Sequence, residues 1–107
     1  MDKPVKIDYS WGTEIVWSNH LEYSGRVFVI KEGDSMPFGY NKQRDKTIFV
    51  LQGIVQLRLE RQTKMLQEGE TYHLSSRIMH QICAIKGDAT ILECGTRLLD
   101  DFVEVKL

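Results

Sequence analysis

This sequence of 107 residues lacks the features that would place it in a membrane, outside the cell or on nucleic acid. None of its apolar runs approaches the ~20 residues needed to cross a bilayer. Its first twelve residues, MDKPVKIDYSWG, lack the apolar core of a signal peptide. Its formal net charge is −1, which provides no basic field for an anionic polymer. We therefore expect a cytoplasmic protein with no membrane partner and no nucleic-acid partner.

Cysteine is also scarce. Cys83 and Cys94 are the only two, and they do not form the CxxC spacing of a redox or zinc-ribbon motif. Both lie in apolar, strand-like runs, QICAI and TILEC. Because thiols in the cytoplasm are normally kept reduced, we expect two buried, reduced cysteines and no disulfide.

Long helical patterns are missing as well, and short strand patterns take their place. No stretch shows a sustained 3.6-residue apolar period, and the length suits a single domain. Turn signals recur at Ser24-Gly25, Glu32-Gly33-Asp34, Gln52-Gly53, Glu68-Gly69, Gly87-Asp88 and Gly95. Between them lie the runs RVFVI, TIFVLQ, IVQLRLE, TYHLS, HQICAI and ATILE. This pattern predicts an all-β sandwich or barrel.

Period-two alternation assigns faces to three of these runs. Residues 54–60 alternate valine and leucine with polar residues, so they predict a strand with one wet face. Residues 46–52 and 80–85 are apolar on both faces apart from their ends, so they predict strands buried between layers. Lys46 and His80 each belong to the inward set of their strand.

Four segments of the sequence, namely two internal blocks, one segment near the N-terminus and one near the C-terminus, resemble a known superfamily. The blocks are GDSMPFGYNKQRDKTIFVLQG (33–53) and GETYHLSSRIMHQI (69–82), and the opening is YSWGTEIVW. With the tail ILECGTRLLDDFVEV, they resemble the cupin superfamily, in particular the short mannose-6-phosphate-isomerase-like cupins. The resemblance implies one jelly-roll β-barrel over residues 11–105, after an N-terminal extension over residues 1–10. Similar small cupins are commonly homodimers, so the resemblance also implies a homodimer.

The resemblance points to a metal site that has lost most of its ligands. In that family the first block carries Gln or His, then His, then Glu, and the second block carries His. The matching positions here are Gly39, Asn41, Lys46 and His80. An ammonium in the carboxylate position repels a cation, by roughly 4 kcal/mol per unit charge at ~4 Å. We therefore expect no metal and no other cofactor.

Lys46 and His80 each have two interpretations. An inward lysine is costly unless it is paired, so Lys46 either meets an anionic ligand or forms an internal salt bridge with Glu93. A ligand could also displace that glutamate. His80 is either a general acid or base, or a core histidine hydrogen-bonded to a backbone carbonyl. A nearby Lys46 ammonium would lower the pKa of His80 and favour the neutral imidazole.

The loop over residues 38–46 packs two aromatic and three cationic residues at the family's ligand-binding mouth. Such a composition suits a sugar ring or base that carries phosphate. The alternative is a solvated loop whose cations balance nearby acidic residues. The candidate ligand-binding residues are Lys46, His80, Tyr40, Asn41, Arg44 and Glu93.

Together these observations predict a metal-independent small cupin that binds a small anionic metabolite, such as a sugar phosphate or a nucleotide derivative. One alternative is a sugar-phosphate isomerase or epimerase, for which Lys46 and His80 are the catalytic candidates. Another is a structural or interaction protein that binds no small molecule. Because one fold supports many functions, the resemblance does not decide among the three.

Overall fold

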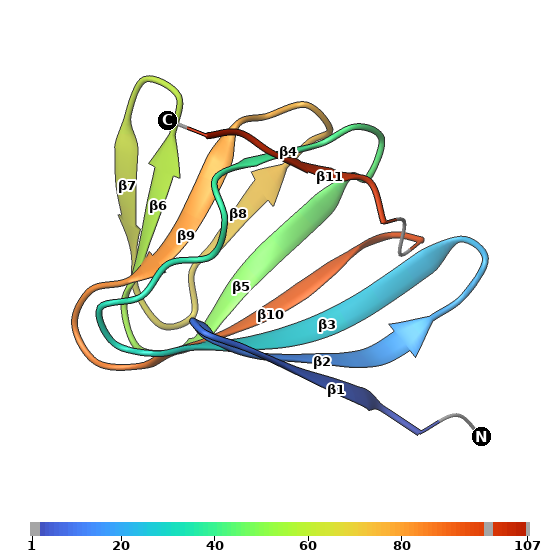
Figure 1. Ribbon diagram of the computed structural model, residues 1–107, viewed down its shortest axis with the longest axis horizontal. Coiled ribbons are helices and arrows are strands. Elements are labelled where there is room, and N and C mark those ends of the chain that lie inside the picture. Colours follow the sequence, from blue (N-terminus) through green and yellow to red (C-terminus); the bar gives the residue numbers. More distant parts are fainter. Residues whose placement is uncertain (1–2, 98–99, 107) are drawn as a thin grey trace.

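The computed structural model describes residues 3–97 and 100–106, and its strands form two antiparallel sheets that face each other (Figure 1). The larger sheet has the order β1-β2-β3-β10-β5-β8 and the smaller has the order β11-β4-β9-β6-β7. This arrangement confirms the predicted all-β jelly roll. Within the described residues there is no helix able to cross a membrane. The strands are β1 Val5–Tyr9, β2 Gly12–Asn19, β3 Tyr23–Ile30, β4 Gly39–Asn41, β5 Lys46–Gln52, β6 Val55–Leu59, β7 Thr63–Leu66, β8 Thr71–Leu74, β9 His80–Ala84, β10 Ala89–Thr96 and β11 Phe102–Glu104.

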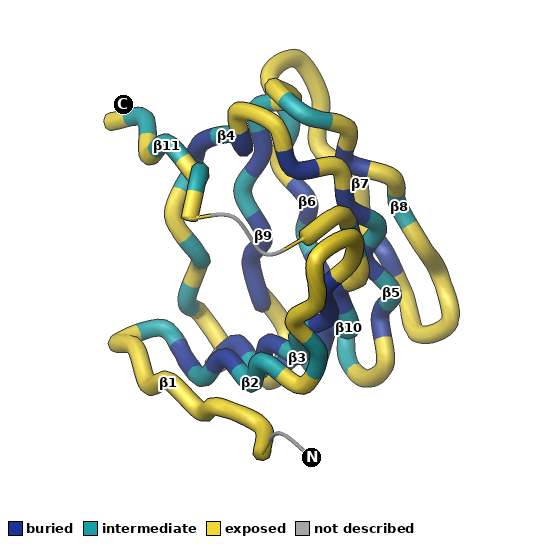
Figure 2. Tube along the Cα trace, turned by 90° about the vertical axis from the view of Figure 1, so that its right-hand side faces the viewer, coloured by how far each residue is buried: buried dark blue, intermediate teal, exposed yellow. Residues whose placement is uncertain are grey.

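The hydrophobic core lies between the inner faces of the two sheets (Figure 2). Each fully buried aliphatic side chain contributes about 1.5–3 kcal/mol to folding. The charged side chains described below lie beside this core in the interior, because Ile82 belongs to the core and also lines their cavity. The fully or almost fully buried members of the core include Ile30, Ile48, Val50 and Ile91 of the larger sheet and Val55, Leu57 and Ile82 of the smaller.

The predicted strand faces are confirmed in part. Residues 54–60 have one wet face as expected, since Val55 and Leu57 are buried and Arg58 is exposed. The prediction for residues 46–52 is wrong on one face, because Leu51 on the outer side of β5 is 45% exposed. The prediction of a doubly buried strand over 80–85 is confirmed from His80 to Ala84, but Ile85 is exposed. Ser35 forms an isolated antiparallel β-bridge with Cys83.

Two glycines predicted to form turns lie inside strands instead. Gly25 of β3 lies under the indole of Trp17, and a Cβ there would come 2.4 Å from the ring. Gly95 of β10 packs against the carbonyl of Asp45, where a Cβ would come equally close at 2.4 Å. Both glycines therefore serve close approach and not a change of chain direction. The turn predictions at Gly33, Gly53, Gly69 and Gly87 are confirmed, each with a positive φ of 80–87°.

Both cysteines are free thiols, but only one of them is in the core. Cys83 is buried, as predicted. The prediction that Cys94 is buried is wrong, because Ile91 and Glu93 take the inward positions of β10 and Cys94 points outward.

The segment expected as an N-terminal extension contains β1, the edge strand of the larger sheet. β1 pairs with β2 from Val5↔Val16 to Tyr9↔Gly12, and all its residues are exposed. Its last residue, Tyr9, reaches the open side of the barrel interior, where it helps to line the cavity described next.

Candidate functional site

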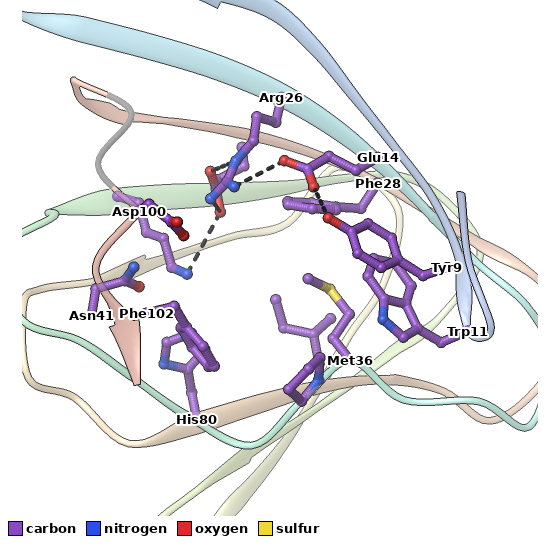
Figure 3. A pocket seen from close by; sticks show the side chains of 14 residues that line it. Tyr9, Trp11, Glu14, Arg26, Phe28, Met36, Asn41, His80, Asp100 and Phe102 are labelled. Carbon is purple, nitrogen blue, oxygen red and sulfur yellow. Dashed lines mark hydrogen bonds and ion pairs between the residues drawn. The ribbon is translucent and has the colours of Figure 1, made fainter. Parts of the chain in front are cut away.

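A cavity of about 230 Å³ opens between the two sheets (Figure 3). It borders the hydrophobic core, because Ile82 of the core is one of its lining residues. The larger sheet supplies four charged side chains, one from each of the strands β2, β3, β5 and β10. The smaller sheet supplies two neutral polar side chains from β4 and β9. These lining residues are Glu14, Arg26, Lys46 and Glu93, and, from the smaller sheet, Asn41 and His80.

The charged groups form one network around Glu93, which we call the ion cluster: Glu14, Arg26, Arg44, Lys46 and Glu93. Arg26 holds the Glu93 carboxylate with two bonds, Nε to Oε1 at 2.8 Å and Nη2 to Oε2 at 3.2 Å. Arg44 Nη2 lies 3.0 Å from Oε1, and Lys46 Nζ lies 3.6 Å from Oε2. Arg26 Nη1 also donates to Glu14 at 3.0 Å. Three cations and two carboxylates leave the ion cluster with one excess positive charge.

The ion pair between Lys46 and Glu93 confirms one of the two interpretations of the inward lysine, and it is the longest contact in the ion cluster. Burial lowers the pKa of Lys46; Glu93 opposes this shift, while Arg26 and Arg44 add to it. Burial alone would raise the pKa of Glu93, but the three cations outweigh it and hold that pKa below its usual value. Glu93 is therefore ionised at neutral pH, and Lys46 is the cation that it holds least tightly.

His80 is a core histidine bonded to a backbone carbonyl, as one of its two interpretations stated. Its Nδ1 lies 2.8 Å from the carbonyl oxygen of Ile78, so Nδ1 carries the proton and donates it. Burial, and after it the charge of Lys46, lower the pKa of His80 to about 4. The direction expected from Lys46 is confirmed. At neutral pH His80 therefore offers an unprotonated Nε2 that can only accept a hydrogen bond.

We predict that His80 stays neutral well below the pH at which an ordinary histidine titrates. Its folded pKa of about 4 lies below the unfolded value of 6.5, so the unfolded chain binds more protons between these two pH values. His80 therefore contributes stability that is fully present above about pH 6.5 and is lost as the pH falls toward 4. Proton NMR of the His80 ring, identified with the His80→Gln variant, should show no titration above about pH 5. A midpoint near 6.5 would contradict the prediction.

Asn41 presents a second acceptor to the same cavity. Its Nδ2 donates to Asp101 at 2.9 Å, and its Oδ1 has no hydrogen-bond partner among residues 3–97 and 100–106, although the residue is only 4% exposed. An unsatisfied buried acceptor costs about 1–3 kcal/mol. A hydroxyl or amino group of a ligand would satisfy it.

Aromatic rings form two walls of the cavity (Figure 3). Tyr9 stacks on Trp11 with centroids 4.7 Å apart, and Trp11 meets Phe28 at 6.1 Å. Across the cavity, the ring of Phe102 meets His80 edge-on at 5.9 Å. Tyr9 donates its hydroxyl to Glu14 at 2.7 Å, and burial together with this bond raises the pKa of Tyr9 to about 12. The aromatic wall is therefore tied to the ion cluster.

Four of the six predicted ligand-binding residues come together in this cavity: Lys46, His80, Asn41 and Glu93. Tyr40 does not line it, because the side chains of β4 alternate and Gly39 and Asn41 take the inward positions. Arg44 does not line it either, since its guanidinium is fully buried and bonds Glu93 and Ser24. The solvated-loop alternative is thus wrong for Arg44, which is a structural counter-ion.

Sequence reasoning missed Arg26 and Glu14, two of the five members of the ion cluster. The signal for Arg26 was available, because Arg26, Phe28 and Ile30 alternate along one face of β3 just as Lys46, Ile48 and Val50 do along β5. Glu14 carries no such signal on β2, because the apolar residues Ile15 and Trp17 alternate onto the opposite face, yet the structure buries Glu14.

Of the four positions that the sequence resemblance assigns to metal ligands, Gly39, Asn41, Lys46 and His80, only His80 carries a side chain that commonly binds a metal. At Gly39 a Cβ would lie 2.0 Å from the carbonyl oxygen of Val103, so β11 leaves no room for a ligating side chain. Lys46 places an ammonium group at the position that the sequence resemblance assigns to a carboxylate. Across residues 3–97 and 100–106, no three His, Cys, Asp or Glu side chains are grouped as a metal site.

Solved structures share this fold, although no protein-family model and no curated protein matches the sequence. KdgF from Halomonas sp. superposes with a TM-score of 0.82 at 15% identity, over 90% of each chain. An RmlC-like cupin from Shewanella frigidimarina gives 0.81 at 10% identity, over 92% of this chain and 87% of that one. The capsular polysaccharide assembling protein CapF from Staphylococcus aureus gives 0.87 at 11% identity, over 98% of this chain but 35% of its own. These likenesses show that the chain has the cupin jelly-roll fold.

Proposed function

We propose that this cupin-fold chain binds, without a metal, a small anionic metabolite that carries hydroxyl groups and is no larger than a monosaccharide derivative. The observation that carries the proposal is the position of Lys46, whose ammonium reaches the cavity from an ion cluster with one excess positive charge.

The charge of the ion cluster favours an anion next to Lys46. Glu93 is already neutralised by Arg26 and Arg44 at 2.8–3.2 Å, so its long contact with Lys46 can be given up at little cost. A carboxylate or phosphate oxygen ~4 Å from the ammonium gains roughly 4 kcal/mol at an effective dielectric near 20. Asp100 also lines the cavity, but it is exposed and solvent screens its charge.

The two acceptors in the cavity define the rest of the ligand. Nε2 of His80 and Oδ1 of Asn41 can be satisfied only by a donor, and a hydroxyl group provides one. The rings of Trp11 and Phe102 offer flat apolar surfaces for the carbon skeleton. Pockets for drug-sized ligands measure ~300–1,000 Å³, so a cavity of about 230 Å³ favours a monosaccharide derivative over a nucleotide.

Thermal unfolding with matched ligand pairs tests the proposal. We would compare glucose with gluconate, and mannose with mannose 6-phosphate, at constant ionic strength and in the presence of a chelator, with inorganic phosphate as a further control. The acid or phosphate of at least one pair should stabilise the protein, by ~2.7 kcal/mol at 100 times its dissociation constant, and its neutral partner should not. Equal stabilisation by both members of each pair, stabilisation by phosphate alone, or no stabilisation at all would each contradict the proposal.

A further inference from the structure

We propose that Lys46 captures carbonyl ligands covalently, by forming an imine with the carbonyl carbon of a small keto or aldehyde acid. This inference rests on the proposed function, because the ligand acid group is held in the same cavity. It adds a chemical class, namely α-keto acids and related carbonyl compounds, and a reaction that anion binding alone does not require.

The position of Lys46 meets the geometric needs of a nucleophile. Its backbone is held on both sides within the larger sheet, where it pairs with Leu74 of β8 and Gly95 of β10. Its Nζ lies at the cavity, 3.6 Å from Glu93 and 5.8 Å from the centre of the Phe102 ring. Its ion pair with Glu93, at 3.6 Å the longest contact of the ion cluster, leaves the amine room to turn toward a carbonyl carbon.

The excess positive charge of the ion cluster can be removed either by a bound anion or by loss of the Lys46 proton, and the second gives the neutral amine that imine formation needs. If Lys46 gives up its proton, two arginines and two glutamates remain, and their charges balance. The Glu93 carboxylate keeps its shorter contacts with Arg26 and Arg44, which measure 2.8–3.2 Å. The other titratable groups facing the cavity are the neutral His80, the Tyr9 hydroxyl and the exposed Asp100. A desolvated lysine beside other cations is a recognised form of activated nucleophile.

The reaction consumes no oxidant or reductant. The lone pair of the neutral Nζ attacks the carbonyl carbon, a C–N bond forms, and the carbonyl electron pair moves to the oxygen. Nε2 of His80 takes a proton from the nitrogen and passes it to that oxygen, giving a carbinolamine. The second N–H proton and the hydroxyl then leave as one water, and the C=N bond forms. A proton from solvent converts the imine into an iminium, whose positive charge lies beside Glu93 and the acid group of the ligand.

Reductive trapping on the folded wild-type chain tests the inference. The protein would be treated at pH 7 with pyruvate and cyanoborohydride, and the product examined by intact mass and peptide mapping. We expect one adduct per chain, located at Lys46 and formed at least tenfold faster than at the exposed Lys86. An ordinary lysine, with a pKa near 10.4, has only roughly one neutral amine in a few thousand at pH 7.

Two lysine variants test whether the adduct forms at Lys46. Lys46→Arg retains a cation but cannot form an imine, so it should lose the adduct, whereas Lys86→Arg should retain it. Glu14→Gln adds to the excess positive charge and should speed trapping. Absence of an adduct, or adducts spread evenly over exposed lysines, would overturn the inference.

The failure of this inference can be distinguished from failure of the proposed function. Stabilisation by gluconate, which has no carbonyl group able to form an imine, would support anion binding even if pyruvate is not trapped. Trapping of the uncharged dihydroxyacetone at Lys46, with no stabilisation by any acid, would support imine formation and contradict anion binding.

Discussion

Glu93→Gln is expected to lower the free energy of unfolding by about 3–5 kcal/mol, the usual cost of removing one partner from a buried ion pair. The carboxylate is 1% exposed and is the common partner of Arg26, Arg44 and Lys46. Glutamine has nearly the same shape but no charge, so the loss measures electrostatics and not packing. Three cations would remain together, with only Glu14 to compensate them.

The effect of this substitution should depend on pH. The folded-state pKa of Glu93 lies below its unfolded value near 4.5, so the unfolded chain binds more protons in that range. The contribution of Glu93 is therefore fully present above about pH 4.5 and is lost as the pH falls through the folded-state pKa. The difference between wild type and Glu93→Gln should be largest at neutral pH and should shrink under acid conditions.

Urea unfolding at several pH values measures both effects. Glu104→Gln is a matched control, because Glu104 is exposed and pairs only with the exposed Lys106 at 3.8 Å. Such surface pairs contribute about 0–1 kcal/mol, so the control should unfold almost like wild type. A Glu93→Gln variant as stable as this control would contradict the central role given to Glu93.

Period-two alternation predicts much of the site from the sequence, because it depends only on neighbouring residues. It placed Lys46 and His80 inward from the composition of their own strands, and the structure puts both side chains in one cavity. The pairing and register of strands that are distant in the sequence cannot be obtained from such local patterns. Arg26 and Glu93 are 67 residues apart, and they meet only because β3 and β10 are adjacent in the sheet. Nothing local to either residue specifies that pairing.

The loop over residues 38–46 shows the limit of composition as evidence. Its composition favours a cluster of cations at the entrance of a ligand-binding site. In the structure the cations separate, since Arg44 is fully buried and Lys42 is exposed. The turn predictions at Gly25 and Gly95 are wrong for a related reason, because the ring of Trp17 and the carbonyl of Asp45 require these glycines inside strands. The physical causes in both cases are long-range contacts, which a single sequence does not display.

Replacing Lys46 by methionine is expected to weaken binding of the most stabilising anion at least tenfold while leaving the fold as stable as wild type or about 1 kcal/mol more stable. Methionine has a similar length and no charge, so burial no longer opposes it. The ion cluster then contains two arginines and two glutamates, and Glu93 keeps its shorter contacts with Arg26 and Arg44.

Calorimetric titration and urea unfolding of the same Lys46→Met preparation separate the two halves of this prediction. Lys86→Met serves as the matched control, because that lysine is exposed and outside the cavity, and it should bind the anion like wild type. Loss of binding with unchanged stability would identify Lys46 as a residue kept for its ligand and not for folding, since proteins tolerate such costs at functional sites. If Lys46→Met instead loses several kcal/mol of stability, the lysine is a structural counter-ion of Glu93, and the cavity has no spare cation to offer an anion.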